Sequence, residues 1–132
     1  MKAKKHLLCG FLLAITLIFS LSSFASPDSD KNEQAIKSIA QILSHVNHFP
    51  SAAEKKKLQE IADNSKSANI RVLANAMINM QHSVGSADKA KLKTILNDAH
   101  ADDDAKELAS ILMHFNHQPS SADKKKLHHI MD

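Results

Sequence analysis

Histidine is the residue in this chain best suited to chemistry, because its imidazole binds transition metals and titrates near neutral pH. Eight of the nine histidines follow residue 25. Two copies of a histidine, any residue, asparagine, histidine pattern give the pairs His45/His48 and His114/His117. Residues three apart share a helix face, so each pair could chelate Zn²⁺, Cu²⁺ or Ni²⁺. With a third ligand expected on the last helix, the candidate metal ligands are His45, His48, His114, His117, His128 and His129.

A structural role competes with this hypothesis. His48, His82 and His117 occur once in each of three copies of a repeat. Histidines at the end of a helix interact favourably with its last carbonyl groups. Neighbouring helices lie ~8–10 Å apart, so residues that recur once per stacked unit are not expected to close around one ion. The sequence therefore favours a turn role for these three histidines.

The repeat itself defines the elements that must position these side chains. The segment Ser38–Asp63 returns as Glu107–Asp132, with a diverged copy at Val72–Asp98. Steps of 34 and 35 residues bring the copies into register. Periods of this length are typical of paired helices. The predicted organisation begins with a cleavable leader at 1–25 and a lead-in at 26–35 that starts the first helix. A single domain follows, with three repeats at 36–69, 70–104 and 105–132.

Apolar residues recur at helical spacing in both halves of each repeat, so every predicted helix has one apolar face. The first helices carry this pattern at Ile36, Ile39, Ala40, Leu43 and Val46, at Ile70, Leu73, Ala74, Met77 and Met80, and at Ala105, Leu108, Ala109, Leu112 and Phe115. One hairpin cannot bury its apolar face alone, whereas about three packed units can. The predicted fold is all-α, with three tandem αα-hairpins in a short α-solenoid or a closed six-helix bundle.

The turns between paired helices contain residues that end the first helix and residues that begin the second. Pro50 and Pro119 disfavour helix at the preceding residue, and the serines that follow them can cap the next helix. Acidic residues three positions further complete a capping box. In the middle repeat, Gly85 occupies the cap position. The first helices are expected to begin near Asp30, Ser67 and Asp102.

The stretch Asp63–Met77, DNSKSANIRVLANAM, resembles the HEAT-type repeat, in which an acidic turn precedes a helix reading Val/Ile-Arg-x-x-Ala-x-x-x-Leu. The resemblance covers one helix start per repeat and implies stacked helix pairs. The 34 to 35 residue spacing is short for that family, and the Trp, Gly and Tyr positions of tetratricopeptide repeats are absent. No functional residue is carried over from either family.

The first 25 residues have the pattern of a secretory signal peptide. Lysines precede an apolar run over Leu7–Phe19, and small residues lead to Ala25. The predicted product is periplasmic or secreted. The alternative is an uncleaved anchor, because Leu7–Ala25 could just span a bilayer of roughly 30 Å. Cys9 does not fit a lipoprotein signal, because Leu8 precedes it and the apolar run continues beyond it.

Charge and composition exclude several functions for the exported chain. Three of the 17 Lys and Arg residues lie in the leader, which leaves 14 basic and 14 acidic residues in the remainder. Zero net charge argues against nucleic-acid binding. Without cysteine after the leader, stability must come from packing rather than disulfides. No Gly-rich loop or nucleophile motif is present, so the chain is not predicted to be an enzyme.

Lysine runs supply a second candidate site. The possible interaction edge consists of Lys55, Lys56, Lys57, Lys124, Lys125 and Lys126. In parallel hairpins these lysines would line one edge and bind an acidic protein, an anionic polysaccharide or lipid A-type phosphates. A simple solvated face is the alternative.

The function predicted from the sequence is a small exported binding or interaction module of unknown partner. The alternative is a histidine-dependent envelope protein for Zn, Cu or Ni, and a third hypothesis is a pH-responsive protein. No cofactor is predicted beyond such a metal. Met77 and Met80 occupy core positions of the repeat, so they are expected to be core residues rather than copper ligands.

Overall fold

The computed structural model describes residues 27–132 and contains helices only. The helices are α1 Pro27–His45, α2 Ala52–Asn64, α3 Ala68–Asn79, α4 Ser86–Asn97, α5 Asp103–His114 and α6 Ser121–Met131. The predicted all-α class, with one helix pair per repeat, is therefore confirmed. The predicted signal peptide and Cys9 lie outside the described residues. Within 27–132, no helix is both long enough and apolar enough to cross a membrane.

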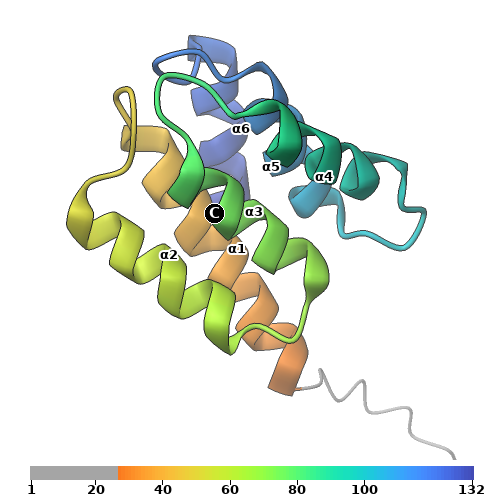
Figure 1. The fold of residues 1–132 in the computed structure, drawn as a ribbon. Coiled ribbons are helices and arrows are strands. Elements are labelled where there is room, and N and C mark those ends of the chain that lie inside the picture. Colours follow the sequence, from red (N-terminus) through yellow and green to blue (C-terminus); the bar gives the residue numbers. More distant parts are fainter. Residues whose placement is uncertain (1–26) are drawn as a thin grey trace, which may run out of the picture.

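The helices form a closed ring of alternating inner and outer positions (Figure 1). The inner helices α1, α3 and α5 all contact one another. Each outer helix packs mainly against the first helix of the next repeat, so α2 lies on α3, and α4 lies on α5. Helix α6 continues the pattern by packing on α1, which joins the last repeat to the first. The predicted packing of helical hairpins is thus found, and the contact of α6 with α1 gives it the closed form.

The core follows the predicted apolar pattern. Every apolar position predicted in the three inner helices is buried, including Met77 and Met80, which confirms that these methionines are core residues. Three further positions are buried at equivalent places in the repeats, Ile42, Ala76 and Ile111. The buried stripe is wider than the sequence pattern indicated because each inner helix contacts neighbours on several sides.

The helix starts follow the predicted cap chemistry in most places. Ser51 with Glu54, and Ser120 with Asp123, form complete capping boxes at α2 and α6. The predicted N-caps of α3 and α5 also accept backbone N–H groups. The start of α1 near Asp30 is wrong, because α1 begins at Pro27.

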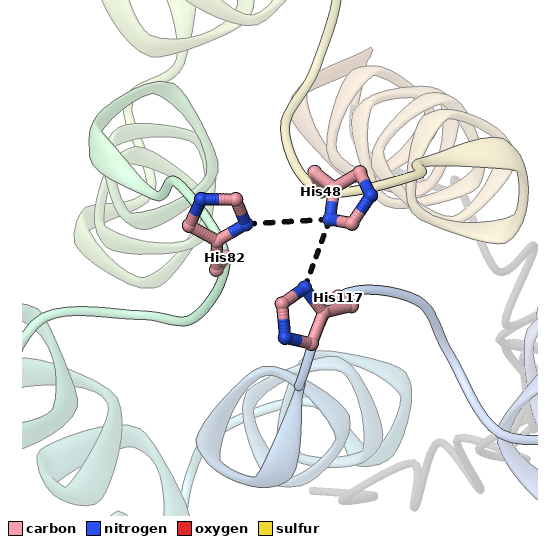
Figure 2. Close-up of side chains that lie close together, drawn as sticks. All are labelled: His48, His82 and His117. Carbon is pink, nitrogen blue, oxygen red and sulfur yellow. Dashed lines mark hydrogen bonds between the residues drawn. The ribbon is translucent and has the colours of Figure 1, made fainter.

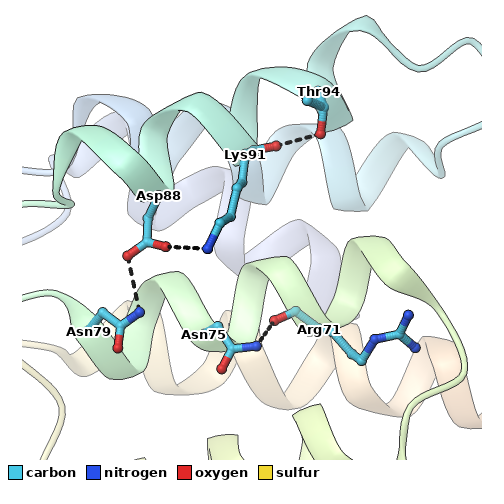
Figure 3. A network of polar contacts seen from close by, with 6 residues as sticks. All are labelled: Arg71, Asn75, Asn79, Asp88, Lys91 and Thr94. Carbon is cyan, nitrogen blue, oxygen red and sulfur yellow. Dashed lines mark hydrogen bonds and ion pairs between the residues drawn. The ribbon is translucent and has the colours of Figure 1, made fainter.

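The middle repeat differs from the other two at its cap, and Figure 3 shows the polar contacts of Asp88 that replace the cap. Gly85 offers no side-chain cap to α4. Asp88, at the position of the capping acids, is instead buried, with Asn79 donating to its carboxylate at 3.2 Å and Lys91 at 3.5 Å. Asn79 stands where the other repeats have a histidine. The acid that caps α2 and α6 therefore joins α3 to α4 here.

Substituting Gly85→Ser should stabilise the protein by a few tenths of a kcal/mol, because the serine side chain can accept a hydrogen bond at the start of α4 and glycine has no side chain to do so. Gly85 has φ −66°, and an added Cβ meets open space. Urea unfolding of both proteins measures the change. Gly85→Ala is the matched control and should not stabilise, since alanine is a poor N-cap. Equal stability of the Ser and Ala variants would show that no cap had formed.

Candidate metal centre

Three equivalent turns bring His48, His82 and His117 together at one end of the bundle (Figure 2). Each histidine lies three residues beyond the end of an inner helix, α1, α3 or α5. Because the three inner helices pack around a common axis, their following turns meet at that axis. The cluster lies at the surface, with His82 and His117 exposed.

The Nδ1 atoms of the three imidazoles face one another. The Nδ1 of His48 lies 2.8 Å from that of His117 and 3.3 Å from that of His82. One ligand atom from each ring lies within 4.8 Å of the other two. A tetrahedral metal with bonds of about 2.0–2.1 Å holds its ligand nitrogens roughly 3.3 Å apart. The two recorded Nδ1 distances lie close to this spacing, and Figure 2 draws them as hydrogen bonds between the rings.

Main-chain bonds fix the three turns to one another. The N–H of His117 donates to the carbonyl of His82 at 2.7 Å, and the N–H of His48 donates to the carbonyl of His117. These bonds connect turns from all three repeats, which are otherwise distant in sequence. The ligand positions are thus built on a hydrogen-bonded platform rather than on independent loops.

His48 and His117 adopt a backbone conformation that glycine prefers, with φ of 72° and 64°. Only a few per cent of non-glycine residues have positive φ, and histidine is among the residue types enriched there. Glycine would satisfy such a turn at lower cost, yet the chain keeps an imidazole at both positions. Positive φ at these two positions is therefore compatible with a turn role as well as with a ligand role.

The turn role predicted for these three histidines rested on a linear stack of hairpins. In a closed ring, residues that occur once per repeat surround a common axis instead of lying along a row. The spacing between helix axes does not limit them, because they lie beyond the helix ends. The expectation that they could not surround one ion is wrong.

The predicted paired ligands behave differently. Helix α1 ends at His45 and α5 ends at His114, so neither pair lies on one helix face. The Nδ1 atoms of His45 and His114 instead lie 2.9 Å and 3.0 Å from carbonyl oxygens of their own helices, those of Gln41 and Ser110. The carbonyl interaction expected of helix-end histidines is therefore found here, at the first member of each pair.

The third ligand expected from the last helix is also replaced. His128 and His129 are exposed on α6, about two turns beyond the histidine end of the bundle, and are not part of the cluster. His82 takes this place. Its signal in the sequence is its register, 34 residues after His48 and 35 before His117.

The surroundings of the cluster favour a transition-metal cation. The C-terminal ends of α1, α3 and α5 point towards this face, and helix C-termini carry partial negative charge. The turns at 46–51, 80–85 and 115–120 contain no Asp or Glu, so imidazole is the only strong ligand they supply. Oxygen-seeking Ca²⁺ and Mg²⁺ do not match this donor set, whereas Zn²⁺, Cu²⁺ and Ni²⁺ do.

The lysine runs of the possible interaction edge lie at the starts of two outer helices, and the edge itself stays a prediction. They lie on α2 and α6, which do not contact each other. Lys126 pairs with Glu107 at 2.6 Å, and the hydrogen bond and charge of that carboxylate raise the pKa of Lys126. Lys55 places its Nζ 5.8 Å from the centre of the exposed Phe49 ring, next to His48. This side-chain contact connects Lys55 to the histidine turn of the first repeat.

The opposite end of the same axis holds a polar cavity of about 390 Å³, lined in part by Glu33, His100, Asp102 and Asp104. Loss of hydration, followed by the charge of Asp102, raises the pKa of Asp104. Nearby, the pKa of Asp98 is lowered, chiefly by the backbone N–H of His100. Among the described residues, only the three histidines converge closely enough to hold a metal ion.

No protein-family model, curated protein or solved structure matches this chain. The chemical interpretation of the cluster therefore rests on its own geometry.

Proposed function

We propose that this protein is an exported transition-metal-binding protein that holds one Zn²⁺, Cu²⁺ or Ni²⁺ through His48, His82 and His117. The observation that carries the proposal is the convergence of their Nδ1 atoms from three separate turns. Export is inferred from the signal-peptide pattern of residues 1–25.

Three neutral imidazoles form a ligand set of intermediate softness. Divalent affinities usually rise towards Cu²⁺ and fall again at Zn²⁺, so Cu²⁺ should bind most tightly. A surface position gives metal direct access to and from solution. These properties suit reversible binding, as in buffering or carrying metal, better than a closed structural site.

The direct test is calorimetric titration of residues 26–132, without a polyhistidine tag, with Zn²⁺, Cu²⁺ and Ni²⁺. The expected result is one ion per chain with submicromolar affinity at pH 7.5. Replacing any one of the three ligands by alanine should weaken binding at least about 100-fold, beyond the 10–100-fold typical of outer-shell partners. Binding should also weaken towards pH 5.5, because protons compete for the same nitrogens.

The matched controls are His45→Ala and His114→Ala, which remove exposed histidines only three residues from ligand positions. Both variants should bind metal as the parent does. Binding lost in the controls but kept in His82→Ala would refute the proposed ligand set, and absence of binding in the parent would refute the function. The partner-binding function predicted from the lysine runs stays a prediction.

A further inference from the structure

We infer that the metal centre keeps one coordination position open to solvent, and that this position takes a small monodentate anion such as a carboxylate. The inference rests on the proposed function and concerns what the bound metal can do. Three protein ligands on a four-coordinate metal leave one position for water or an exogenous ligand. The direction of that position decides what can occupy it.

Among the described residues, no fourth His, Cys, Asp or Glu joins the three histidines. Two residues before each histidine lie Val46, Met80 and Phe115, which occupy equivalent places in the repeats and are all buried. The interior behind the three turns is therefore apolar. The histidines themselves lie at the surface, so the open position is directed away from the core and into solvent.

The charge around the centre favours an anion there. A divalent metal bound by three neutral imidazoles keeps its full positive charge. Helices α2, α4 and α6 begin just after the histidine turns, so their positive N-termini offset the negative C-termini of α1, α3 and α5 at this face. The fourth residue of each of these helices is a lysine, at Lys55, Lys89 and Lys124. Lys55 approaches the histidine turn through its contact with the ring of Phe49.

The test uses the chain loaded with Co²⁺, whose visible absorption reports coordination geometry, and sodium azide as the anionic probe. At constant ionic strength, azide should shift the Co²⁺ spectrum with saturation in the millimolar range, and acetate should compete with it. Replacing Lys55, Lys89 and Lys124 together by glutamine should weaken azide binding about fivefold, since exposed charges act weakly one by one. Co²⁺ affinity should not fall in that variant.

Each contrary outcome has a distinct meaning. Absence of Co²⁺ binding would remove the proposed function itself. Bound Co²⁺ with a spectrum insensitive to azide would overturn the open position alone. An azide response that appears only after Met80→Leu would make the thioether the fourth ligand, and metal-dependent dimers in light scattering would assign that ligand to a second copy; both outcomes overturn the inference. Unchanged azide affinity in the lysine variant would overturn the role of the lysines.

Discussion

Zn²⁺ at a free concentration 100 times its Kd should raise the free energy of unfolding by about 2.7 kcal/mol. The reason is that the ion binds the folded chain, in which three distant turns supply the ligands together. For a domain of this size, such a gain should raise the melting temperature by roughly 10–20 °C. Circular dichroism melts with and without Zn²⁺ measure the shift.

Variants identify the origin of this stabilisation. His82→Ala should remove most of it, whereas His45→Ala, which changes an exposed helix-end residue, should retain it. An equal rise in melting temperature for both variants would mean that Zn²⁺ acts elsewhere, for example at His128 and His129. That result would contradict the three-histidine centre even if titration had shown binding.

Leu58→Ala, Leu92→Ala and Leu127→Ala should destabilise the protein by similar amounts, about 2–5 kcal/mol each. These leucines occupy equivalent positions on the three outer helices, and all are fully buried. In a closed ring no repeat is terminal, because α6 packs on α1 as α4 packs on α5. Urea unfolding followed by circular dichroism measures each loss against a typical total of 5–15 kcal/mol.

An open array would give a different result. Its last helix would unfold separately, so Leu127→Ala would cost much less than Leu92→Ala, and unfolding would show more than one transition. Either observation would contradict ring closure. Lys56→Ala, an exposed change on α2, is the control and should alter stability by less than about 0.5 kcal/mol.

Local features of this fold could be predicted from the sequence because each depends on neighbours along the chain. The spacing of Leu108, Ala109 and Leu112 defines one buried face, and the pairs Ser51/Glu54 and Ser120/Asp123 cap helices within three residues. These signals are complete within one repeat. They are the same in an open stack and in a closed ring.

Closure could not be predicted, because it depends on which surface meets the last helix. Leu127 and Ile130 form a stripe that would cover a following repeat equally well, and only the structure shows α1 in that place. Identifying His82 as a candidate metal ligand depended on knowing that the helices close into a ring. In a linear stack, His82 would be one of a row of turn residues. In the ring, it is the third member of the histidine cluster.

The helix end at His45 separates the two histidines of the predicted pair. If α1 had continued through the motif, His45 and His48 would have shared one face. Asp88 shows the same limit, because its burial depends on Asn79 from the preceding helix as well as on its own repeat. The position of each of these side chains depends on residues outside the short sequence pattern that contains it.

The direction of α1 determines how the protein would present its metal when attached to something else. Helix α1 runs for 19 residues, about 28 Å, towards the histidine turns, and α6 runs away from them to the end of the chain. Both ends of the described chain therefore lie away from the imidazoles. Tethered by either end to a bilayer, a bead or a fusion partner, the bundle would hold its metal-binding face outward, where another molecule could collect the ion.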